Sequence, residues 1–190
     1  LTLLFTTDAY DPAAVLAAVR EQIGSSKLVG FCCAGILTEE GVNLQGVGVC
    51  TLAGGFRAFT TLQKNLGGDP LEAGCRTGDA VVAAGFESGT AVVLPDGFQA
   101  NLSEMLRGLY SRLGADFRYI GGGAGDNLKF FKTFQFTEQG VDSDAVATAV
   151  LDGAAISTAI GHGWTPMGHP MVMTKVRGKT VYEIDGIPAF

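Results

Sequence analysis

Residues 117–126 read Phe-Arg-Tyr-Ile-Gly-Gly-Gly-Ala-Gly-Asp, a strand-like run that leads into a glycine-rich turn. Because glycine adopts positive φ readily, this turn lets the backbone approach a ligand or a neighbouring segment closely. Such turns also expose several N–H groups in a concavity that suits anions. The alternative is a tight strand-to-loop turn that binds nothing. From this stretch alone, both interpretations stay open.

A related pattern lies 90 residues upstream. Residues 24–35 align without gaps with residues 114–125, and the segments before them keep the same offset. In each copy a helix cap, Asp11 or Asn101, is followed by apolar residues at helical spacing. We therefore predict two duplicated halves, 1–90 and from residue 91 onward, each folding as strand, helix, strand and glycine-rich turn.

The expected leading strands are 3–6 and 91–94, with returning strands 28–32 and 117–120 parallel to them. A duplicated half-fold often places a site at the junction of its halves. The two Ala-Gly turns, near residues 34 and 124, are therefore predicted to face each other. Chance similarity is the alternative, because few residues are identical between the halves.

The remaining segments are predicted mostly as strands. Asp152-Gly153 between apolar runs favours a hairpin of 145–151 with 154–160, over a helix at 143–151. Short links of this kind favour antiparallel pairing, so the predicted fold is α+β, with mixed sheets, antiparallel hairpins and two packed helices. The other expected segments are strands at 42–51, 56–62 and 130–136, a strand or buried turn at 80–86, and a hairpin of 171–176 with 180–184 across Arg177-Gly178-Lys179.

Composition excludes several classes of function. The net charge is −6 and no Lys/Arg run occurs, so binding to nucleic acid has no electrostatic basis. No apolar segment approaches the ~20 residues of a membrane span, so no membrane insertion is expected. Hydrophobic residues make up 47% of the chain and the mean hydropathy is +0.28, which is typical of a folded globular domain.

No cofactor or metal is predicted. The four cysteines and two histidines lack the spacing of a zinc site, and reduced thiols in a cytoplasmic setting are the default. The turn at 121–126 lacks the G-x-G-x-x-G pattern of dinucleotide-binding folds, and no Gly-Lys-Ser/Thr follows it as in a P-loop.

Taken together, these motifs resemble the FIST N-terminal domain. The most specific set is His162-Gly163-Trp164-Thr165-Pro166, the Gly121–Asp126 turn, and the terminal Ile184-Asp185-Gly186-Ile187-Pro188-Ala189. The order is that of the family, and the resemblance covers nearly the whole chain. One departure lies near the first turn, Gly30–Ile36, where two cysteines replace hydroxyl residues and Ile36 replaces an acidic residue.

The resemblance implies one FIST N-type domain over residues 1–190, an intracellular, non-enzymatic sensory module of signal-transduction proteins. Its ligand would be a small molecule, with amino acids suggested. The implied partners are a FIST C-terminal domain and a fused or separate signalling output module. The chain also lacks the family's initial segment, so we expect it to be a fragment of a longer protein.

An amino-acid ligand needs donors for its carboxylate and a carboxylate for its ammonium. The amides of Gly121, Gly122 and Gly123, with His162, would supply the first, and Asp126 or Asp96 the second. Trp164 would form a wall. Each residue also has a structural alternative: Asp126 as a cap of the following loop, His162 as a buried ring bonded to backbone, Trp164 as core, and Asp96 as a turn residue.

Two rival functions remain. In a hydrolase-like enzyme, Cys32 or Cys33 would act as nucleophile with His162 as base. No motif links these residues, so this interpretation is disfavoured. The other rival is a scaffold that binds only protein partners and no small molecule.

Overall fold

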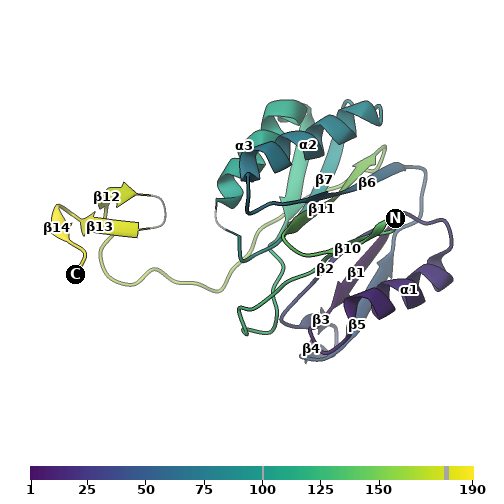
Figure 1. Cartoon of the computed structure of the whole chain (residues 1–190), viewed down its shortest axis with the longest axis horizontal. Helices are drawn as coiled ribbons and strands as arrows, with labels where there is room; N and C mark the ends of the chain where they lie inside the picture. Colours follow the sequence, from purple (N-terminus) through teal and green to yellow (C-terminus); the bar gives the residue numbers. More distant parts are fainter. Residues whose placement is uncertain (100, 178–179) are drawn as a thin grey trace. The chain divides into compact units, whose positions relative to one another are not determined.

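The computed structural model describes residues 1–99, 101–177 and 180–190. The chain divides into two compact units, Leu1–Ile156 and Ser157–Phe190. Over the described residues, three α-helices accompany several mixed and antiparallel sheets, which confirms the α+β class (Figure 1). None of these helices has the length and apolar character that a membrane crossing requires.

The first sheet of the larger unit is built around a parallel pair of strands. Helix α1 (Pro12–Ile23) connects this pair, and antiparallel strands extend the sheet on both sides. In spatial order the strands are β10 (Gly140–Asp142), β9 (Gln135–Thr137), β2 (Leu28–Cys32), β1 (Thr2–Thr6) and β5 (Val47–Thr51).

The second sheet contains the other parallel pair. Helix α3 (Leu102–Leu113) connects β7 to β8, a one-turn 3-10 helix (Gly114–Asp116) precedes β8, and α2 (Pro70–Ala83) lies beside α3 (Figure 1). In spatial order the strands are β6 (Arg57–Lys64), β11 (Ala145–Asp152), β7 (Gly89–Pro95) and β8 (Phe117–Gly121).

Three cores show that this unit has four layers. One core lies between α1 and the first sheet, one between the two sheets, and one between the second sheet and the pair α2–α3. The first contains Leu4, Leu16, Leu28 and Phe136; the second includes Leu1, Val29, Leu94 and Leu151; and the third includes Leu66, Val81, Phe86, Met105, Leu109 and Phe117. The order of layers is therefore helix, sheet, sheet, helices (Figure 1).

The helices begin at identifiable caps, although one helix was missed. Asp11 caps α1 by accepting from the Ala14 amide at 2.7 Å. Asp69 caps α2 in the same way, with Pro70 at the first helical position. The expected strand or buried turn at 80–86 was wrong for residues 80–83, which belong to α2, whereas residues 84 and 85 form a turn. Asn101 precedes α3 as predicted, but at φ 62° and without a side-chain cap bond.

Helices α2 and α3 pack closely because glycines face the partner backbone. A Cβ on Gly74 would lie 2.0 Å from the Met105 carbonyl oxygen, and one on Gly108 would lie 2.1 Å from that of Leu71. Of the two helices predicted within strand–helix–strand units, α3 belongs to the packed pair. Its partner, α2, was not predicted.

Several strand predictions need correction. β11 exists, but residues 154–160 form no strand, so the hairpin at Asp152-Gly153 was wrong. β11 pairs instead with β6 and β7, far away in sequence. Of 130–136 only the end is strand, in β9, and 42–51 splits into β4 (Gly41–Asn43), which pairs with β3 (Ile36–Thr38), and β5.

The smaller unit contains the second predicted hairpin. β12 (Met173–Arg177) pairs antiparallel with β13 (Thr180–Ile184), and β14 (Ile187–Pro188) follows. The predicted turn residues Gly178 and Lys179 lie outside the described residues.

Both strand–helix–strand units have the predicted parallel strands, but their registers differ. Leu4 pairs with Gly30, whereas Val93 pairs with Gly121, so paired positions lie two residues farther apart in the second unit. No alignment free of gaps can match both strands at once. The internal duplication therefore stays a prediction.

Candidate functional site

The two glycine-rich turns meet, as predicted. The Gly125 amide donates to the Cys32 carbonyl oxygen at 3.0 Å, and a Cβ on Gly125 would lie 3.7 Å from the Ala34 nitrogen. The turn after β8 also contacts the end of β7, because the Ala124 amide donates to the Pro95 carbonyl oxygen at 2.9 Å. The ends of the two parallel strand pairs thus lie against each other.

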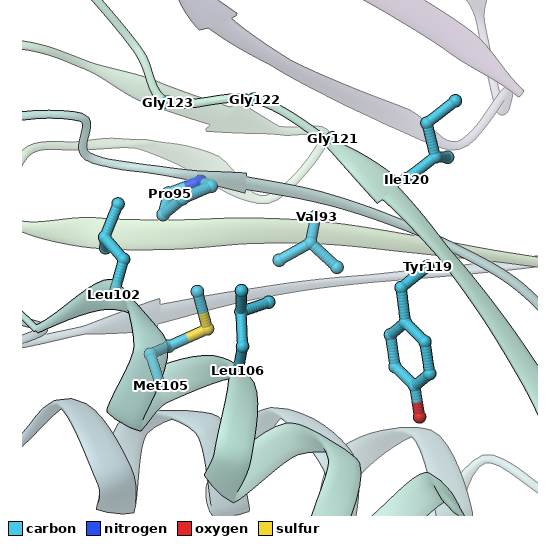
Figure 2. A pocket seen from close by; sticks show the side chains of 10 residues that line it. All are labelled: Val93, Pro95, Leu102, Met105, Leu106, Tyr119, Ile120, Gly121, Gly122 and Gly123. Carbon is cyan, nitrogen blue, oxygen red and sulfur yellow. The ribbon is translucent and has the colours of Figure 1, made fainter. Parts of the chain in front are cut away.

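A cavity of about 260 Å³ opens beside this junction, between the first turns of α3 and the ends of β7 and β8 (Figure 2). The three predicted glycines form one side of it. Its lining residues are Val93, Pro95, Leu102, Met105, Leu106, Tyr119, Ile120, Gly121, Gly122 and Gly123. Ligands of α/β sheets commonly bind outside the carboxyl ends of parallel strands, which is the position of this cavity.

Close packing explains two of the three glycines. A Cβ on Gly121 would lie 1.8 Å from the Val93 carbonyl oxygen, and one on Gly123 would lie 2.8 Å from the Gly97 Cα. Gly122 differs, because a Cβ there would meet nothing within 4 Å. The turn is therefore tight for structural reasons, and it still leaves open space at Gly122.

The cavity wall is mostly hydrocarbon. Tyr119 carries its only side-chain hydroxyl, and that group donates to the Gly114 carbonyl oxygen at 2.7 Å. Burial, and secondarily Tyr110, raises the pKa of Tyr119 to about 12, so the phenol stays neutral. The amides of Gly122 and Gly123 make no hydrogen bond to another described residue. Among the residues that line the cavity, polar contacts for a ligand would therefore come from the backbone.

Asp126 is buried and holds the loop that follows it. Its Oδ1 accepts from the Phe130 amide at 2.8 Å, and its Oδ2 accepts from Phe131 at 2.6 Å and Lys132 at 3.0 Å. Burial alone would raise the pKa of this carboxyl, but the amides of residues 129–132 outweigh it and hold the pKa below its ordinary value. The loop-capping alternative thus has a direct geometric basis.

Asp96 is also buried, in the turn after β7. Its Oδ1 accepts from the Phe98 amide at 2.9 Å, and its Oδ2 from the Asp144 amide at 3.2 Å. Neither Asp96 nor Asp126 lines the cavity. Both hold the backbone around it, and contact between either carboxylate and a ligand stays a prediction.

His162 and Trp164 belong to the smaller unit, in a segment without helix or strand. Both are exposed, and 85% of Trp164 is accessible. The alternatives of a buried histidine and a core tryptophan therefore have no support among the described residues. Their contact with a ligand stays a prediction.

The cysteines near the first turn are poor nucleophiles. Burial raises the pKa of the Cys32 thiol to about 11, although the Phe134 amide, which donates to its Sγ at 3.0 Å, partly opposes this shift. Burial also raises the pKa of the Cys33 thiol. Since the thiolate is the reactive form, both residues are largely unreactive at neutral pH. Over the part of the chain that is described, no cluster of His, Cys, Asp and Glu suits a metal ion.

Sequence reasoning missed the apolar wall of the cavity. Met105 and Leu106 are among the apolar residues at helical spacing that follow Asn101, and that spacing indicates only that α3 packs against its sheet. A signal existed in Tyr119 and Ile120, which directly precede the glycine turn at the end of a strand. A second, smaller cavity of about 50 Å³ lies at the end of β1 and is lined partly by Asp8 and Lys132.

Two comparisons with known proteins found similarities. The family model described as FIST N domain matches residues 1–187. A protein of Methanocaldococcus jannaschii, described as uncharacterized protein MJ1623, is 40% identical over 72 residues. That match covers 37% of this chain and 14% of the relative, so the chain spans only a small part of the relative's length.

Proposed function

Because the chain belongs to the FIST N domain family of sensory domains in signal-transduction proteins, we propose that it binds a small-molecule ligand in the cavity beside α3. The observation that carries this proposal is the position of Gly121, Gly122 and Gly123. The sequence pattern predicts that these three glycines bind a ligand, and they line a cavity of about 260 Å³. Cavities of this kind, apolar with a few backbone polar groups, are typical of small-molecule sites.

The proposed ligand is an amino acid. Its carboxylate would accept from the free amides of the glycine turn, with His162 as a second donor. Asp126 or Asp96 would attract its ammonium, and Trp164 would contact its body. The bound state would then be passed to a FIST C-terminal domain and a signalling output module. The free cysteines are consistent with a cytoplasmic protein.

The site supports sensing rather than catalysis. Catalytic cysteines need a depressed pKa, and burial raises the pKa of both Cys32 and Cys33. His162 lies in the other unit. The enzyme alternative therefore lacks an activated nucleophile among the residues first considered for it.

A thermal-shift screen of the chain against amino acids, small organic acids and nucleotides tests the proposal. A ligand that binds only the folded state stabilises it by about 2.7 kcal/mol at 100-fold over Kd. Leu106 lines the cavity and is partly exposed, so Leu106→Trp should fill the cavity and abolish the shift. Val82, on the exposed side of α2, provides the matched control Val82→Trp, which should leave the shift intact. A flat screen on folded protein would instead favour the scaffold alternative.

A further inference from the structure

We infer that the cavity holds an apolar side chain of the ligand and leaves the charged groups of the ligand at the glycine turn, so the domain selects hydrophobic amino acids. This inference rests on the proposed function, and it names the ligand class that the cavity accepts. It is carried by the chemistry of the wall, the volume, and the position of the available backbone donors.

The wall offers no partner to a charged or strongly polar side chain. Val93, Leu102, Met105 and Leu106 contribute only hydrocarbon and a thioether, and the hydroxyl of Tyr119 is already bonded to the Gly114 carbonyl oxygen (Figure 2). An ammonium or carboxylate that entered would lose water without gaining a hydrogen bond, which is strongly unfavourable. An aliphatic or aromatic group would gain contacts with every side of the wall.

The volume sets the size of that group. An apolar cavity of about 150 Å³ accepts a benzene ring, and this cavity measures about 260 Å³. It therefore has room for the side chains of leucine, isoleucine, methionine or phenylalanine. Met105, whose flexible thioether adapts to different shapes, would let the wall close around more than one of them.

The polar end of the ligand has one suitable place. Gly122 and Gly123 combine unengaged amides with open space at Gly122. This turn is one side of the cavity, so a carboxylate bound there leaves the side chain directed toward α3. The Asp96–Gly97 turn packs against Gly123 and borders the same end.

Calorimetric titration of the full chain tests the inference. Leucine and phenylalanine should bind at least tenfold more tightly than asparagine, aspartate and lysine. Leu106→Trp should abolish binding of leucine, and Val82→Trp should preserve it. Leu106→Asp places a carboxylate in the wall. It should therefore weaken the binding of leucine at least tenfold and strengthen the binding of lysine relative to that of leucine.

The outcomes distinguish a loss of side-chain selectivity from a loss of amino-acid binding. If no amino acid binds the folded chain, this inference and the amino-acid ligand both fail, and the thermal-shift screen with organic acids and nucleotides decides whether the cavity binds another small molecule. If aspartate or lysine binds as tightly as leucine, or leucine binding is unchanged in Leu106→Trp, the side-chain selection is overturned while amino-acid sensing stands. Circular dichroism identifies any variant that has not folded. Leu106→Ala would then be used in its place, and it should lower the affinity for leucine by a smaller factor.

Discussion

At the scale of single residues, Glu138 joins the two sheets of the larger unit. Its carboxylate accepts from Lys27 Nζ at 2.9 Å and the Leu28 amide at 3.1 Å beside the first sheet, and from Thr60 Oγ1 of β6 in the second. Burial would raise the pKa of Glu138, but these hydrogen bonds outweigh it and hold the pKa below its ordinary value of 4.5. The carboxylate therefore stabilises the fold in its charged form.

Glu138→Gln should lower the free energy of unfolding at pH 7 by about 2 kcal/mol. Because the folded-state pKa is depressed, this contribution is fully present above the unfolded pKa and is lost as the pH falls through the folded pKa. The difference between the two proteins should thus shrink below pH 4.5. Urea unfolding at several pH values measures it, with exposed Glu87→Gln as the control. A difference that stayed constant into acid would contradict the ionic role.

The cysteines allow a second test at this scale. Cys50 is exposed, whereas Cys32 is buried with a pKa of about 11, so iodoacetamide at neutral pH should modify Cys50 well before Cys32. Mass spectrometry of a time course gives the order of modification. Faster labelling of Cys32 than of Cys50 would show an activated thiol and revive the enzyme alternative.

At the scale of elements, small residues decide how α2 and α3 pack. Gly-to-Ala changes inside helices usually favour the helix by about 1 kcal/mol. At Gly74 the new Cβ would meet the Met105 carbonyl oxygen at 2.0 Å, so the helices must separate. Gly74→Ala should therefore lower the free energy of unfolding by about 2 kcal/mol or more. Chemical denaturation measures this, and Gly122→Ala, which meets nothing within 4 Å, should be nearly neutral.

The same packing explains which elements were predictable. α1 was predicted because Asp11-Pro12 gives a cap and its apolar residues repeat at helical spacing. α2 buries Ala73, Gly74, Thr77, Gly78 and Val81. Because only Val81 among them is a large apolar residue, no clear apolar stripe marks the helix, and its cap at Asp69 was overlooked. β11 was recognised as a strand. It pairs with β6 on one side and β7 on the other, and both partners are distant in sequence, so a local Asp-Gly signal cannot reveal them.

The loop after Asp126 shows a similar limit. Residues Asn127, Leu128 and Phe130 have positive φ, which is uncommon for residues other than glycine. The carboxylate of Asp126 holds this conformation through three amides. The alternation of phenylalanines at 130–136 indicated a strand, and the side-chain contact overrides that pattern. The capping role was foreseen as one of two alternatives for Asp126.

At the scale of the whole molecule, the glycine turn belongs to a site whose wall comes from distant parts of the chain. The turn itself was predictable from composition, as was its contact with the first turn. The apolar wall was not, because it forms only when α3 lies across the ends of β7 and β8. The four-layer order likewise depends on β9 and β10 joining β2 across about a hundred residues of sequence.

Trp164 provides the test that addresses the full chain, because it is the only tryptophan. If it contacts the ligand as predicted, titration with leucine should shift its fluorescence to shorter wavelength, since the exposed indole would leave water. Trp164→Phe should then weaken binding severalfold while changing the free energy of unfolding by less than about 0.5 kcal/mol, as expected away from the cores. Leucine binding detected by calorimetry without any fluorescence change would place the ligand on the larger unit alone. The glycine turn and α3 would then be sufficient for recognition, and the second donor proposed at His162 would have to be sought elsewhere on the chain.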